Sequence, residues 1–118
     1  MRTRYAEVQP YLTKDGSEIR ELMHPWRHGN AKQSFAEAIV GPDMETRLHL
    51  HRETEEIYYI AEGAGLMRLG KQTFDVTAGD TVAIAPGTPH SMRNTGKTAL
   101  RILCACSPPY SHDDTELL

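Results

Sequence analysis

The chain has 118 residues, a length that accommodates one domain with a single core. Its formal net charge is −3 and its Lys and Arg residues are scattered, which excludes the basic surface that nucleic acid or an anionic membrane requires. No apolar run approaches the ~18 residues that span a bilayer, and residues 1–16 lack the apolar segment of a secretory signal. We therefore expect a cytoplasmic protein with neither a nucleic-acid nor a membrane partner.

Short apolar or alternating segments follow one another along the chain, each bounded by Gly, Pro, Asn or Asp. They predict strands at residues 18–23, 34–40, 47–51, 57–60, 66–69, 72–76, 81–84, 91–94 and 99–106. Residues 1–16 predict a short leading strand or an arm over a neighbour. No segment has the pattern of a long amphipathic helix, so the sequence predicts an all-β sandwich or small closed barrel.

The tail at residues 107–118 has two interpretations. Ser111 followed by Asp114 resembles a capping box and favours a short terminal helix, whereas the acidic composition also suits a frayed end. The only two cysteines, Cys104 and Cys106, are separated by one residue, a strand geometry unsuited to a disulfide. We therefore exclude a disulfide framework.

His49 and His51 lie one residue apart in a predicted strand. In a strand such residues share a face, about 7 Å apart along the chain, so their imidazoles can converge on one ion. A polar break follows, and the next apolar run begins at Ile57. We interpret the two runs as a hairpin that carries two histidines on its first strand and a carboxylate at the foot of its second.

Three carboxylates crowd this break: Glu53, Glu55 and Glu56. Strand alternation places Glu56 on the same face as Tyr58 and Ile60, and Glu55 on the opposite face. We choose Glu56 as the ligand, with Glu55 as the alternative. His90 is the fourth candidate, because it follows the loop at residues 85–89, whose two prolines restrict the backbone before binding. Imidazoles with a carboxylate suit zinc, iron, copper, nickel or manganese.

These residues resemble the two motifs of the cupin superfamily. The first motif is Gly, five residues, His-x-His, three or four residues, Glu, six residues and Gly. It is matched here by His49, His51, Glu56 and Gly63, with Asp43 where the first Gly usually stands. The second motif is Gly, five residues, Pro-x-Gly, two residues, His, three residues and Asn. It is matched by Gly79, Gly87, His90 and Asn94, with Ala85 in place of the usual Pro and Pro86 following it.

The resemblance implies one cupin domain over residues 1–118, a small antiparallel β-barrel of jelly-roll type. Its motif core would be residues 41–94, preceded by leading strands or an arm at residues 1–30 and followed by the tail at residues 107–118. One divalent transition metal per chain (Fe, Mn, Zn, Ni or Cu) would be held by His49, His51, Glu56 and His90. The resemblance also implies a homodimer paired through its sheets.

We expect a small-molecule substrate on the open side of the metal, among residues of the same strand faces. Alternation nominates Arg47, Tyr58, Met92 and Cys104. Arg47 could clamp a substrate carboxylate or lie in solvent, and Tyr58, Met92 and Cys104 could equally be core residues. The leading hypothesis is a metal-dependent enzyme with dioxygenase-like chemistry. The alternatives are an isomerase, epimerase or lyase on the same site, or a cupin that binds a sugar without catalysis.

Overall fold

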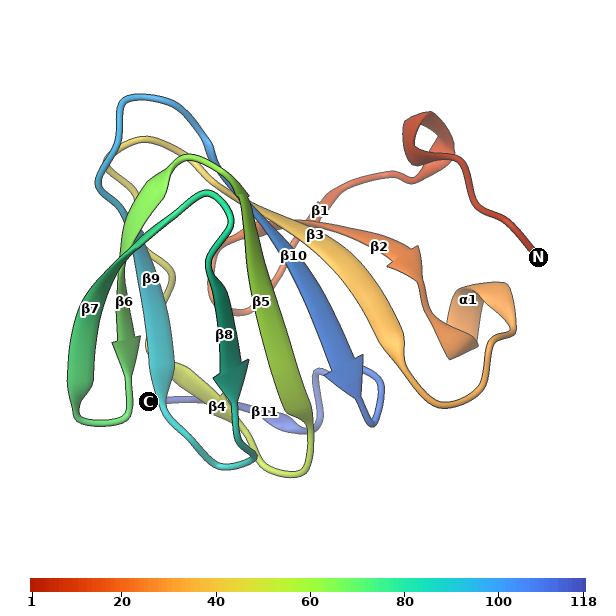
Figure 1. Ribbon diagram of the computed structural model, residues 1–118. Helices are drawn as coiled ribbons and strands as arrows, with labels where there is room; N and C mark the ends of the chain where they lie inside the picture. The colour runs from red at the N-terminus through yellow and green to blue at the C-terminus, as the bar shows by residue number, and fades with distance from the viewer.

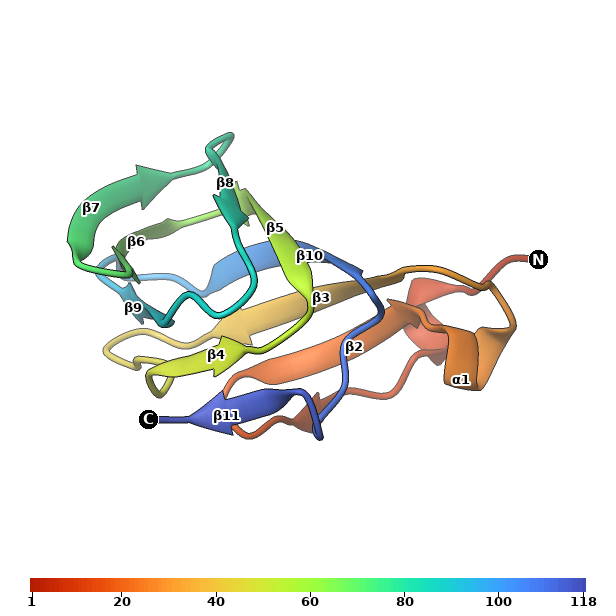
Figure 2. The same ribbon diagram turned by 90° about the horizontal axis from the view of Figure 1, so that it is seen from below.

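The computed structural model describes residues 1–118 and contains two antiparallel sheets that face each other (Figure 1). The six-stranded sheet consists, in spatial order, of β1 (Tyr11–Leu12), β2 (Glu18–Met23), β3 (Ser34–Val40), β10 (Leu100–Ser107), β5 (Glu55–Glu62) and β8 (Thr81–Ile84). The five-stranded sheet consists of β11 (Thr115–Leu117), β4 (His49–His51), β9 (His90–Asn94), β6 (Ala64–Leu69) and β7 (Gln72–Thr77). Figure 2 shows the two sheets curving around a common interior. The predicted all-β jelly roll is confirmed.

Helical structure is confined to one 3₁₀ turn, η1 (Tyr5–Glu7), and one short α-helix, α1 (Pro25–His28). The absence of a long helix agrees with the sequence prediction. Neither element is long and apolar enough to cross a membrane.

Alternation along the strands sorts side chains between the interior and the surface. On β5 the buried residues are Glu56, Tyr58 and Ile60, as strand alternation predicts, and the intervening Ile57 and Tyr59 are exposed. On the inner face of β3 and β10 the side chains facing the site are small: Ser34, Ala36, Ala38, Cys104 and Cys106. Elsewhere in the barrel large side chains fill the core, among them Ile60, Met67, Val76, Ile84 and Leu100. The small residues leave a cavity on one side of a packed core.

The predicted hairpin around the histidines is wrong. β4 pairs with β9 and β11 in one sheet, whereas β5 pairs with β10 and β8 in the other. The chain at residues 52–54 therefore crosses between the sheets instead of turning back within one. Because the inner faces of both sheets look into the same interior, the histidines of β4 still face Glu56 of β5.

Backbone conformations at the motif positions agree with the sequence. Asp43 stands where the first cupin motif has a glycine, and it is the only non-glycine residue with a positive φ, +62°. Aspartate tolerates this left-handed conformation better than most residues. Gly87 has φ +77°, and its N–H donates to the carbonyl of His51 at 2.7 Å. This bond attaches the loop before His90 to the strand that carries the other two histidines.

Neither interpretation of the tail was right, because it ends in the strand β11. β11 pairs with β4, with Thr115 opposite His51 and Leu117 opposite His49. The Asp114 carboxylate accepts hydrogen bonds from the N–H groups of Glu53 and Thr54. The tail is therefore fastened along the strand that carries the metal-ligand candidates.

Candidate metal centre

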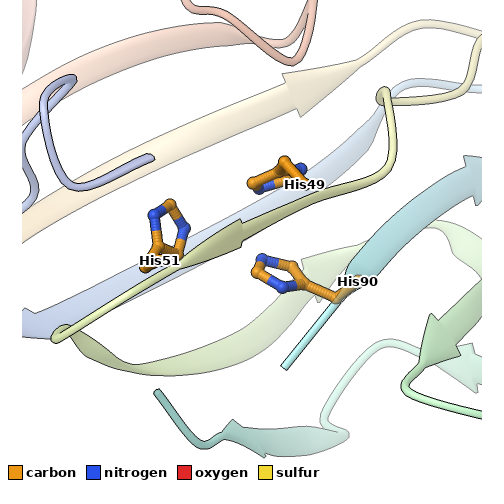
Figure 3. Close-up of side chains that lie close together, drawn as sticks. All are labelled: His49, His51 and His90. Atoms are coloured by element: carbon orange, nitrogen blue, oxygen red, sulfur yellow. The ribbon is translucent and has the colours of Figure 1, made fainter. Parts of the chain in front are cut away.

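Three buried histidines converge inside the barrel (Figure 3). His49 and His51 lie on β4, and His90, the first residue of β9, is paired in register with His49. One ring nitrogen of each histidine lies within 4.8 Å of the corresponding atoms of the other two. A cluster of this kind can hold a metal ion.

The Nδ1 atom of each imidazole is engaged by an oxygen. His49 Nδ1 lies 2.7 Å from the Arg47 carbonyl, and His90 Nδ1 lies 2.9 Å from the Thr88 carbonyl. Because a carbonyl only accepts hydrogen bonds, both Nδ1 atoms carry the proton in these contacts. Burial lowers the pKa of His49, which favours its neutral form. In this tautomer Nε2 presents a lone pair, as a metal ligand must.

His51 is oriented in the same way by a side chain. Its Nδ1 lies 2.9 Å from Thr115 Oγ1 on β11. The Thr115 hydroxyl donates to the Ser111 carbonyl at 2.8 Å, so toward His51 it acts as the acceptor. The Nδ1 atoms of all three histidines are thus engaged, and their Nε2 atoms face the same region.

Glu56 completes the predicted ligand set. Its Oε1 lies 3.2 Å from His51 Nε2 and 3.5 Å from His90 Nε2, and its Oε2 accepts from Cys106 Sγ at 3.3 Å. Burial raises the pKa of Glu56, but the adjoining His51 and His90 imidazoles outweigh burial and lower it to about 2. The side chain is therefore a carboxylate at neutral pH.

The site also contains buried polar atoms with no hydrogen-bond partner, Glu56 Oε1 and His90 Nε2. Buried polar atoms without a hydrogen-bond partner are costly. A divalent cation between them would satisfy all of these atoms at once. The residues therefore fit a transition metal with nitrogen and oxygen ligands.

Asp15 is a further carboxylate at this site, and sequence reasoning missed it. It lies in the turn between β1 and β2, and its Oδ2 is 3.6 Å from His49 Nε2. Its Oδ1 accepts from the Thr13 hydroxyl and from the N–H and hydroxyl of Ser17. The sequence marks Asp15 only as part of a turn. Its approach to His49 depends on the fold, since the Arg47 N–H binds the Asp15 carbonyl at 2.8 Å.

The centre opens onto a cavity of about 40 Å³. Of the residues nominated for substrate binding, Tyr58, Met92 and Cys104 line this cavity and are buried. Cys106 lines it too, so both thiols face the interior. Arg47 does not line it, because its side chain is exposed two residues before β4 begins. The contact of Arg47 with the site is through its carbonyl, which binds His49 Nδ1.

Comparison with known proteins agrees with this geometry. The chain is 54% identical over 118 residues to Uncharacterized protein MJ1618 of Methanocaldococcus jannaschii, covering 100% of this chain and 94% of that protein. It is 34% identical over 84 residues to an oxalate-binding protein of Thermotoga maritima, covering 71% of this chain and 65% of that protein. A crystal structure from Thermotoga maritima, described as a predicted oxalate decarboxylase, superposes with a TM-score of 0.79 at 28% identity, covering 92% of this chain and 99% of that one.

The family model described as Cupin domain matches residues 36–106, which include all four predicted metal ligands. The motif resemblance implied this arrangement of the two sheets and of the three histidines. The chain belongs to the cupin family.

Proposed function

We propose that the protein is a metal-dependent enzyme that acts on a small oxygen-bearing organic molecule. The observation that carries the proposal is the convergence of three histidine ring nitrogens and the unpartnered Glu56 Oε1 at one point beside a cavity. Such an arrangement costs folding free energy unless a cation resolves it. His49, His51, Glu56 and His90 would hold one divalent transition metal.

The metal would supply Lewis acidity toward a ligand oxygen and, if it is iron, manganese or copper, dioxygen activation. The remaining residues have distinct tasks. Cys106 fixes Glu56 by donating to Oε2, which leaves Oε1 for the metal. Asp15 Oδ2 lies beside the centre without being needed as a ligand, so it is placed to accept a proton from a bound substrate. The apolar part of the cavity lining would limit the access of water to the centre.

We favour dioxygenase-like chemistry, with isomerisation or a lyase reaction as alternatives if zinc or nickel is bound. The two Thermotoga maritima proteins, named for oxalate binding and oxalate decarboxylation, support a small carboxylic acid as the substrate class. No Lys or Arg side chain lines the cavity, so the metal itself would meet the negative charge of such an acid.

Reconstitution with each metal in turn tests the site. Elemental analysis should find about one transition metal per chain, and His49→Ala with His51→Ala should abolish it. His112→Ala is the matched control, because this histidine is exposed on the tail and belongs to no cluster. A native protein that takes up no metal even after reconstitution would contradict the proposal.

Oxygen uptake and carbon dioxide release, measured over a panel of small carboxylic acids, would then separate the reaction classes. A dioxygenase consumes oxygen, a decarboxylating lyase releases carbon dioxide, and an isomerase does neither. A second candidate function is ligand binding without turnover, which the name of the oxalate-binding relative favours. It would be shown by metal-dependent binding of an acid that is recovered unchanged.

A further inference from the structure

The cavity contains a second polar group, remote from the metal-ligand candidates. Glu21 lines the cavity from β2 and is 4% exposed. Its Oε1 accepts a hydrogen bond from the Tyr11 hydroxyl at 3.0 Å, whereas its Oε2 is buried and has no partner. A buried carboxyl oxygen without a hydrogen-bond partner costs folding free energy, and a ligand group that binds it would remove this cost.

The sheet register sets the position of Glu21 relative to the metal centre. Glu21 is paired with Ala36, Ala36 with Cys104, and Cys104 with Tyr58. Three strand spacings of about 4.8 Å place the Cα atoms of Glu21 and Tyr58 roughly 14 Å apart. Glu56 is the next residue on the same face of β5. Glu21 and the metal centre therefore lie at opposite sides of the inner face of the six-stranded sheet.

Small side chains separate these two polar groups. Ala36 and Cys104 lie between Glu21 and Tyr58, and Ser34 and Cys106 occupy the same strands in the adjoining row. None of them projects far into the cavity. The inner face of the six-stranded sheet between Glu21 and Glu56 therefore leaves room for a ligand that contacts both groups.

Resting on the proposed function, we infer that Glu21 is the second anchor of the ligand. The ligand is a small, unbranched molecule that binds the metal through oxygen at one end and carries a hydroxyl group at the other, hydrogen-bonded to Glu21 Oε2. A hydroxyl suits Oε2 in either protonation state, because it both donates and accepts. A second carboxylate suits it less well, because it would add a negative charge beside this carboxyl, and no Lys or Arg side chain lines the cavity.

The size of the cavity limits the length of the ligand. A cavity of about 40 Å³ holds a few water molecules or a chain of a few heavy atoms. Short ω-hydroxy acids satisfy this limit and have matched analogues without the hydroxyl. Suitable pairs are 3-hydroxypropionate with propionate and 4-hydroxybutyrate with butyrate. Glycolate is unsuitable, because its hydroxyl can bind the same metal as its carboxylate.

Calorimetric titration of the manganese-loaded full-length protein with each pair tests the inference. The quantity that decides it is the ratio of affinities within a pair, since the shared carboxylate contributes equally to both members. We expect the hydroxy acid of the better-fitting pair to bind about tenfold more tightly than its analogue, the effect of one buried hydrogen bond. A crystal structure of that complex should place the hydroxyl within hydrogen-bond distance of Glu21 Oε2.

Substitutions at Glu21 test whether this side chain causes the preference for the hydroxy acid over its analogue. Glu21→Met removes the hydrogen bond while conserving volume and should reduce the ratio to about one, whereas Glu21→Gln keeps a polar end and should retain most of it. Glu18→Gln is the matched control, because Glu18 lies on the same strand with its side chain on the other face. Glu21→Met also removes the acceptor of the Tyr11 hydroxyl, so melting temperature and manganese content check that the variant folds and binds metal like the wild type.

The outcomes separate this inference from the proposed function. If manganese does not load but another divalent transition metal does, the titrations use that metal. If no metal loads, the proposed metal site is wrong, and the ratio measured in the metal-free protein still decides the role of Glu21. If manganese loads and the wild type shows no preference for the hydroxy acid, the second anchor is wrong and water alone satisfies Oε2. A preference that persists in Glu21→Met would also overturn it.

Discussion

Thr115 Oγ1 lies 2.9 Å from His51 Nδ1, and this contact joins the last strand of the chain to the metal centre. The two residues are 64 positions apart in sequence and opposite each other in the pairing of β11 with β4. Because the Thr115 hydroxyl donates to the Ser111 carbonyl, it presents a lone pair to His51 and fixes the tautomer that leaves Nε2 free. The tail therefore contributes to the site through His51.

Replacement of this hydroxyl should weaken metal binding. Thr115→Val keeps the shape and strand preference of the side chain but removes the acceptor, so we expect metal affinity to fall about 10- to 100-fold, as for other residues that orient a ligand. Thr115→Ser restores the hydroxyl and should bind metal nearly as the wild type does. Competition with a chromophoric chelator measures both. Equal affinity of the valine variant and the wild type would show that β11 has no part in the site.

Metal removal should lower thermal stability. The ligand atoms come from two strands of one sheet and one strand of the other, so an ion held by them binds the folded chain and not the unfolded one. At a free metal concentration of 100 times Kd the stabilisation is about 2.7 kcal/mol, which for a chain of this size raises Tm by roughly 10 °C. Scanning calorimetry of metal-loaded protein and of protein stripped by a chelator measures the shift. Identical Tm values would contradict an interior metal site.

The sequence contains the local part of the site but not the contacts that support it. Alternation around His49 and His51 fixes their shared face, and the same alternation selects Glu56 from its acidic neighbours. Asp15 and Thr115 reach the site only through chain pairing over long sequence separations, which no local pattern encodes.

The two errors of fold prediction have the same origin. Alternation predicts that β4 and β5 are strands but says nothing about which strands they pair with, so a crossing between sheets has the same pattern as a hairpin. β11 is only three residues long and shows no apolar alternation. Its strand conformation comes from pairing with β4, where Leu118 N–H also binds the Leu48 carbonyl at 3.0 Å.

Homodimerisation remains a prediction, and the outer face of the six-stranded sheet is where we expect it. Phe35, Ala105 and Ile57 are register partners across β3, β10 and β5. Phe35 and Ile57 are 40% and 42% exposed, and the neighbouring Tyr59 is 44% exposed. Because apolar side chains gathered on one face favour association, two copies that stack these faces would remove them from water.

Ile57→Lys tests this interface. A charge at the centre of the buried face should shift the protein to monomer, whereas Met44→Lys, at a residue that is 53% exposed in a turn outside this face, should leave the dimer intact. Sedimentation equilibrium measures the mass of each variant. A wild type that is monomeric at every concentration, or an Ile57→Lys variant that dimerises like the wild type, would contradict the prediction.

Glu21 should make stability depend on pH in a defined direction. Burial raises the pKa of this carboxyl above its ordinary value of 4.5, against the smaller opposing effects of Tyr11, His24, Arg27 and His112. Between 4.5 and the raised value, the folded chain keeps a proton that the unfolded chain has lost. The free energy of unfolding therefore falls as pH rises through this window, by at most about 1.4 kcal/mol per pH unit. Below 4.5 both states are protonated and the dependence vanishes.

Glu21→Gln removes this titration and leaves the others in place. The difference in unfolding free energy between the variant and the wild type should stay constant below the ordinary carboxyl pKa of 4.5 and grow in favour of the variant as pH rises above it. Urea unfolding of both proteins without metal, at a series of pH values, measures this difference, and the histidines of the metal centre cancel because both proteins contain them. A difference that does not change with pH would mean that Glu21 ionises as readily in the folded chain as in the unfolded one. Glu21 would then be a solvated carboxylate rather than a buried group that binds a ligand.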